Sequence, residues 1–152
     1  MTMKGLDEAT QIAAAKALFN EVWTLLDKPD RSEDDCARMV HASHASRYLW
    51  EDVGAEEQRA RGEWQISRVY ATLGRAEPAL HHARACLAHV EQGSLGAFDR
   101  GFAHEAIARA ASVGGDAAMA REHASEAARC AEKVEDAEDR ELLLGDLRTL
   151  PV

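Results

Sequence analysis

The sequence has few aromatic residues, prolines and cysteines, and it has no long apolar run. Aromatic residues make up 5% of its 152 residues, and it has three prolines and three cysteines. Sheets favour aromatic and β-branched residues, so an alanine-rich hydrophobic fraction of 46% favours closely packed helices instead. No stretch approaches membrane-spanning length, and the segment Met1–Glu8 has no apolar signal core. These absences predict a soluble, cytoplasmic protein.

Positive charge is also in deficit. The chain carries 18 lysines and arginines against 27 aspartates and glutamates, a formal net charge of −9. Such a field repels phosphate backbones and anionic membrane surfaces, so we expect neither nucleic acid nor a membrane as a partner. The odd number of widely spaced cysteines, with no Cys-x-x-Cys pair, predicts reduced thiols in helices rather than disulfides.

Apolar residues recur every three or four positions along nearly the whole chain, which predicts helices. Ser32 and Asp35 resemble a capping box that opens one of them. We expect a single α-helical domain spanning residues 1–152. The predicted helices run from Leu6 to Leu26, from Ser32 to about Val53, on both sides of Gly74 within Arg61–Val90, from Phe98 to Val113, from Ala117 to Val134 and from Ala137 to Leu150.

The stretch from Arg61 to Val90 is predicted to be a helical hairpin that organises the rest. In its first helix Ile66 belongs to an apolar stripe, whereas Trp64 lies two positions earlier and therefore points almost the opposite way. A helix that is apolar on two sides is expected in the middle of a stack, with one side in the core and the other facing a groove.

The segments around Gly74 and Gly115 share a pattern of helix, glycine turn and an alanine five residues later. The two glycines are 41 residues apart. The chain here resembles the tetratricopeptide repeat (TPR) family, and the run Gly62–Tyr70 is similar to uncharacterised bacterial proteins of this helical-hairpin type. The positions that carry the resemblance are Ser67, Tyr70, Gly74, Ala79 and Cys86 in one unit and Ala108, Ala111, Gly115, Ala120 and Ala127 in the next.

The resemblance implies an all-α fold of antiparallel hairpins, stacked as a short right-handed array of about seven helices with a C-terminal capping helix. It also implies that the first helix of each hairpin lines a concave wall. The ligand-binding groove expected there consists of Arg61, Trp64, Arg68, Phe102, Glu105 and Arg109.

The function predicted from this groove is non-enzymatic binding, without a cofactor. The partner would be a protein segment, a small anion held by the arginines, or a second copy in a homodimer. In the competing interpretation, the arginines pair with Glu63 and Glu105 and the aromatic side chains fill the core. A purely structural oligomer is a third possibility.

The alternative to a binding module is a protein of another functional class: a small metal-dependent hydrolase or metal-binding protein. Seven histidines include the pair His41-x-x-His44, which lies on one helical face within chelating reach. These two, with His82 and Glu105, are the candidate ligands for a divalent metal such as zinc. The sequence has no His-Glu-x-x-His motif, no Gly-x-Ser-x-Gly elbow and no phosphate-binding loop. We therefore predict no catalytic residue.

Overall fold

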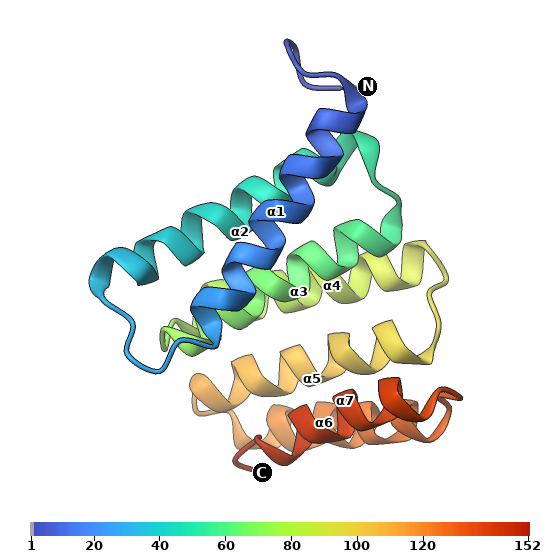
Figure 1. Ribbon diagram of the computed structural model, residues 1–152. Helices are drawn as coiled ribbons and strands as arrows, with labels where there is room; N and C mark the ends of the chain where they lie inside the picture. Colours follow the sequence, from blue (N-terminus) through green and yellow to red (C-terminus); the bar gives the residue numbers. More distant parts are fainter. Residues whose placement is uncertain (1) are drawn as a thin grey trace.

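The computed structural model describes residues 2–152, and this part of the chain forms seven α-helices and no strand (Figure 1). The prediction of an all-α stack of helical hairpins is confirmed. The helices are α1 (Glu8–Leu26), α2 (Glu33–Val53), α3 (Glu56–Thr72), α4 (Ala76–Gln92), α5 (Ala97–Val113), α6 (Ala117–Glu132) and α7 (Ala137–Arg148).

The helix boundaries follow from capping residues. The capping box before α2 is confirmed, since the Asp35 amide donates to Ser32 Oγ and the Ser32 amide donates to Asp35 Oδ2, both at 3.0 Å. Helix α1 begins two residues later than predicted, because the Asp7 carboxylate accepts a hydrogen bond from the Thr10 amide and so caps the helix.

The same turn closes the hairpins α3–α4 and α5–α6. Gly74 and Gly115 take the left-handed conformation, with φ of 74° and 81°. The amide that follows each glycine donates across the turn, from Arg75 to the Tyr70 carbonyl and from Asp116 to the Ala111 carbonyl, both at 2.9 Å. This is the hydrogen bond of a Schellman motif, which glycine favours at this position. The similarity between the two segments is therefore a repeated turn geometry.

Each helix packs against the next along the chain, and alternate helices also meet: α1 contacts α3, α3 contacts α5, and α5 contacts α7. These four odd-numbered helices form one side of the stack (Figure 1). Helix α3 is enclosed on most sides, with nine buried residues from Ala60 to Ala71. Within the described residues, no helix is both long enough and apolar enough to cross a membrane.

Small side chains let the helices approach closely. Ala79 and Ala83 on α4 and Ala103 on α5 are completely buried. Ser67 on α3 donates a buried hydrogen bond of 2.8 Å to the Ala79 carbonyl, which ties the two helices of this hairpin together. The side chains that line the odd-numbered side are held by this tightly packed backbone.

Candidate binding groove

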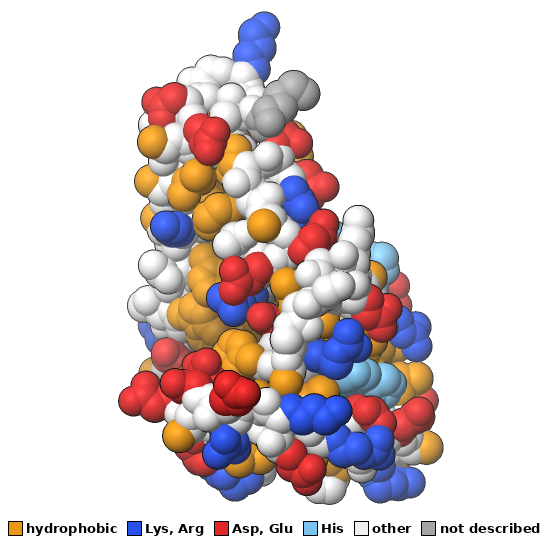
Figure 2. Space-filling view, turned by 90° about the vertical axis from the view of Figure 1, so that its right-hand side faces the viewer, with side chains coloured by type: hydrophobic (Ala, Val, Ile, Leu, Met, Phe, Trp, Pro, Cys, Tyr) orange, Lys and Arg blue, Asp and Glu red, His pale blue; other side chains and the backbone are white. Residues whose placement is uncertain are grey.

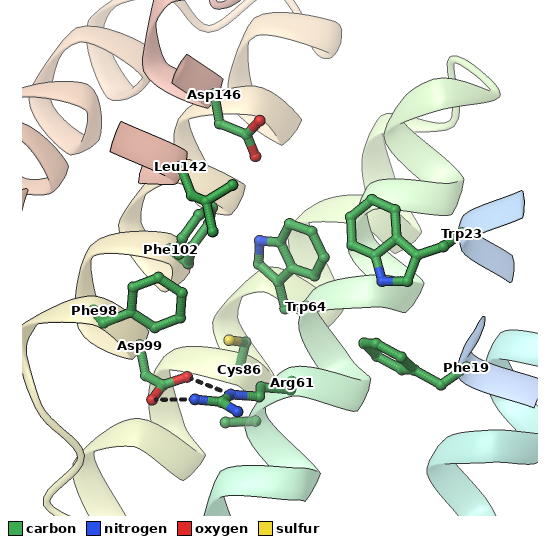
Figure 3. Close-up of a pocket in the computed structure, with 11 residues that line it drawn as sticks. Phe19, Trp23, Arg61, Trp64, Cys86, Phe98, Asp99, Phe102, Leu142 and Asp146 are labelled. Atoms are coloured by element: carbon green, nitrogen blue, oxygen red, sulfur yellow. Dashed lines mark hydrogen bonds and ion pairs between the residues drawn. The ribbon is translucent and has the colours of Figure 1, made fainter. Parts of the chain in front are cut away.

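A cavity of about 390 Å³ lies between α1, α3, α5 and α7 (Figure 3). Every odd-numbered helix contributes to its wall, and α4 contributes Cys86. Most of the lining is apolar. The lining residues are Phe19, Trp23, Ala60, Arg61, Trp64, Cys86, Phe98, Asp99, Phe102, Leu142 and Asp146.

Five aromatic rings form a continuous row across the cavity. Trp23 on α1 and Trp64 on α3 have ring centroids 5.4 Å apart, and Trp64 meets Phe102 on α5 edge-on at 5.7 Å. Phe19 extends the row at one end and Phe98 at the other, at 6.4 and 5.0 Å from their neighbours. The chain has only eight aromatic residues of the types Phe, Trp and Tyr, so more than half of them are concentrated here.

One end of the aromatic row is closed by an ion pair. Arg61 Nε and Nη2 donate to the two carboxylate oxygens of Asp99 at 3.0 and 3.3 Å, and Arg61 also pairs with Glu57 at 2.8 Å. Its guanidinium lies 5.8 Å from the centroid of the Phe98 ring. Burial alone would lower the pKa of Arg61, but the bond to Asp99 and the nearby carboxylates outweigh burial and raise it. The cation is therefore firmly held.

A larger ion-pair network borders the cavity beside Trp64, the middle ring of the row. Glu105 is completely buried and accepts from Arg109 Nε at 2.8 Å and from Arg68 at 3.4 Å. Arg68 also donates to Asp146 at 2.7 Å, and its guanidinium lies 5.1 Å from the Trp64 ring centroid. A hydrogen bond of 2.6 Å to Thr149 fixes Arg109 as well. The network ties α7 to α3 and α5.

Cys86 lies in the cavity wall and is a poor nucleophile, because burial raises the pKa of its thiol and leaves little thiolate. The three cysteines are free thiols, as predicted, and Cys86 and Cys130 are buried. The cavity therefore offers apolar contact and fixed charges. Within residues 2–152 its lining contains no histidine or serine that could act with Cys86.

The structure brings together half of the six residues predicted for the groove. Arg61, Trp64 and Phe102 line the cavity. Arg68, Glu105 and Arg109 form the bordering network, so the competing interpretation holds for them: both arginines pair with Glu105. That interpretation also paired Glu63 with one of these groove arginines, which is wrong, because Glu63 binds Arg47 on α2 at 3.0 Å instead.

Eight lining residues were not among those predicted for the groove: Phe19, Trp23, Ala60, Cys86, Phe98, Asp99, Leu142 and Asp146. Phe19 and Trp23 belong to the apolar stripe of the first predicted helix, but that stripe does not say which other helix it meets. Leu142 lies on the helix expected only to cap the stack, although it is 60% exposed and faces the cavity from one side (Figure 3).

The four candidate metal ligands do not come together. His44 and His82 are neighbours, with ring centroids 5.3 Å apart, but Glu105 is bound by two arginines and His41 is exposed. Across residues 2–152, no group of three or more His, Cys, Asp or Glu side chains is placed to hold a metal ion. The geometry therefore does not support the metal-dependent alternative as it was drawn from these residues.

His44 and His82 belong instead to a polar network that joins α2, α3 and α4. His82 Nδ1 donates to Glu63 at 2.6 Å, and His44 Nε2 bonds the Tyr70 hydroxyl at 2.9 Å. Burial would raise the pKa of Glu63, but the bonds from His82 and Arg47 lower it overall. Burial and the nearby His82 lower the pKa of His44.

A second hollow of about 270 Å³ adjoins the cavity and shares Phe19 and Arg61 with it. Figure 2 shows hydrophobic side chains gathered at the left edge of the molecule, the side nearest the viewer in Figure 1, with acidic side chains directly below them. The cavity is thus part of a longer groove along the odd-numbered helices.

The fold and this groove define an all-α stack of helical hairpins with an aromatic cavity on one side. No family model matches the chain, no curated protein is detectably similar to it in sequence, and no solved structure matches it.

Proposed function

We propose that this protein is a non-enzymatic, TPR-like binding module whose groove holds a segment of a protein partner. The observation that carries the proposal is the aromatic cavity itself. A cavity of about 390 Å³ lies open beside five aromatic rings. Burying these rings fully would stabilise the fold, so leaving them beside an open cavity is costly unless a ligand fills it. Sites that bind ligands are typically concave, mostly apolar and bounded by a few polar groups.

The ion pairs favour an apolar partner segment over a small anion. Arg61, Arg68 and Arg109 were expected to receive a carboxylate from a ligand. Each of them is already bonded to a carboxylate of the chain, namely Asp99, Asp146 or Glu105. An anion would have to displace these partners, whereas an apolar side chain only has to displace water from the aromatic walls.

The hairpin arrangement supports a segment rather than an enclosed small molecule. In TPR-like stacks the first helix of each hairpin faces the partner, and here α1, α3, α5 and α7 together line the groove. The adjoining hollow beside Trp50 extends it along α1. The groove could instead hold a second copy of the chain. The test below distinguishes this occupant, because self-association depends on the protein concentration.

Binding of N-phenyl-1-naphthylamine tests this proposal. This neutral dye fluoresces when it enters an apolar site, so we expect a saturable signal with one dye per chain. Leu142→Ala removes an exposed wall of the cavity and should weaken binding without unfolding the protein. Trp64→Phe should also weaken it, because it removes part of the central aromatic surface.

Tyr48→Ala is the matched control. Tyr48 is 68% exposed on α2 and does not line the cavity, so its removal should leave dye binding unchanged. Sedimentation at several protein concentrations shows whether a second copy blocks the dye. A dye signal that does not saturate, or that responds equally to Tyr48→Ala and Leu142→Ala, would contradict the proposal.

A further inference from the structure

The charges around the groove point to the chemistry of its occupant. Three arginines surround the cavity: Arg61, Arg68 and Arg109. Five carboxylates face them, so the acidic groups are in excess. These carboxylates are Glu57, Asp99, Glu105, Asp139 and Asp146.

Asp146 is the carboxylate best placed to meet a ligand. It projects from α7 toward the space between Phe102 and Trp64 (Figure 3). Arg68 binds its Oδ2 atom, and no donor among residues 2–152 contacts its Oδ1 atom. The other carboxylate in the cavity wall, Asp99, is 14% exposed and accepts from Arg61 with both oxygens, whereas the Asp146 side chain is 30% exposed. A cation inside the cavity would therefore meet Asp146 more readily than Asp99.

The aromatic walls of the cavity also favour a positively charged ligand. The faces of aromatic rings attract cations, and two guanidinium groups of the chain already lie over Trp64 and Phe98. Trp23 and Phe19, on the opposite wall, have no such partner within the described residues. Helix α7 also carries the acidic residues Glu138 and Asp139 in its first turn.

We propose that the segment bound in the groove is basic: an aromatic or aliphatic side chain fills the cavity, and a flanking lysine or arginine contacts Asp146. This inference rests on the proposed function, because it specifies the partner of the same groove. The net charge of −9 acts in the same direction at longer range, since it attracts basic segments and raises their local concentration.

Three synthetic peptides of one design test the charge of the partner. Acetyl-Lys-Ala-Phe-Leu-Ala-Lys-amide, and its analogues with Gln or Glu in place of both lysines, are used to displace N-phenyl-1-naphthylamine from the protein. We expect the Lys peptide to bind about tenfold more tightly than the Glu peptide at low salt. The advantage should shrink as salt is added, because exposed charges are screened.

Asp146→Asn tests whether the effect is local. It should reduce the affinity for the Lys peptide severalfold more than the affinity for the Gln peptide, and the Gln peptide measures any loss of binding that comes from loosening α7. Asp52→Asn is the matched control, since Asp52 is exposed on α2 and its substitution changes the net charge by the same amount. If both variants weaken the Lys peptide equally, only the global charge acts and the contact to Asp146 is wrong.

The other outcomes separate this inference from the proposed function. Equal affinity for the three peptides, tighter binding of the Glu peptide, or displacement by none of them overturns the basic partner, while dye binding still supports the groove. Failure of the dye itself to bind overturns the proposed function. If Asp146→Asn does not fold, the order of the three peptide affinities for the unmodified protein, and its dependence on salt, still decide whether the partner is basic.

Discussion

Arg68 on α3 and Asp146 on α7 are 78 positions apart in the chain and are joined by an ion pair of 2.7 Å. This contact draws the last helix against the centre of the stack. Because Leu142 and Asp146 both lie on α7, one wall of the cavity depends on it. The groove is therefore assembled only when α7 is docked.

Glu105→Gln tests the buried half of this network. Glu105 is completely buried and accepts from Arg68 and Arg109, so its neutralisation leaves two partly buried cations with one carboxylate, Asp146. Removing one partner of a buried ion pair typically costs about 3 to 5 kcal/mol. We expect a loss of that order in the free energy of unfolding, measured by urea denaturation. A loss below about 1 kcal/mol would show that the network contributes little.

Gly101→Ala tests how α7 is seated. A Cβ atom on Gly101 would collide with Leu143 Cδ2 and lie 3.1 Å from Cys130 Cβ. Leu143 is the one buried residue of α7, so the substitution should push this helix outward. Although alanine is the better helix former, overpacking at such a contact typically costs about 1 to 3 kcal/mol. Thermal unfolding measures the loss of stability, and dye binding measures the effect of the displaced α7 on the cavity.

Gly145→Ala is the control for Gly101→Ala. Gly145 also lies in a helix, but a Cβ there would meet only Arg148 Nη2, at 3.7 Å. We expect a gain of up to about 1 kcal/mol from helix propensity and unchanged dye binding. If the two substitutions have the same effect, the close approach of Gly101 to α7 is not what holds the helix.

The His44–Glu63 network predicts that acid destabilises the fold. The pKa of His44 is lowered from 6.5, so the unfolded chain takes up a proton that the folded chain resists, and stability falls as the pH drops through this range. The pKa of Glu63 is lowered from 4.5, so its contribution is present above that value and is lost as the pH falls further. Protonation of either group therefore lowers the free energy of unfolding.

Urea denaturation between pH 8 and pH 4 measures this dependence. His44→Gln should flatten the decline between pH 7 and pH 5. His104 contributes to the remaining pH dependence of stability in this range, because burial and the nearby His123 lower its pKa as well. His41→Gln, an exposed histidine on the same helix, is the control. Stability that rises on acidification, or an equal flattening by both variants, would contradict this explanation.

Local signals in the sequence predicted the helices and their turns, since caps and left-handed glycines act over a few residues. The capping box at Ser32 and the turns at Gly74 and Gly115 are examples. The opposite orientation of Trp64 and Ile66 followed from helical spacing alone. That spacing placed Trp64 in the groove, where it lies 91% buried rather than fully exposed.

The contacts between distant helices could not be predicted in this way. The metal-binding alternative placed Glu105 with His44 and His82, but only the two histidines meet. Glu105 binds Arg68 and Arg109, as the competing interpretation of the groove expected, and no local pattern decides between the two. For the same reason Trp23 and Asp146 were missed. Their role in the cavity depends on which helices pack side by side, and that depends on the packing of the whole stack.

The most direct test of the groove is an NMR titration of the ¹⁵N-labelled protein with unlabelled indole. The chain has three tryptophans: Trp23 and Trp64 line the cavity, and Trp50 lines the adjoining hollow. We predict that the side-chain N–H signals of Trp23 and Trp64 shift together and saturate at the same indole concentration. If neither signal shifts, or if only that of Trp50 responds, the cavity is not a binding site.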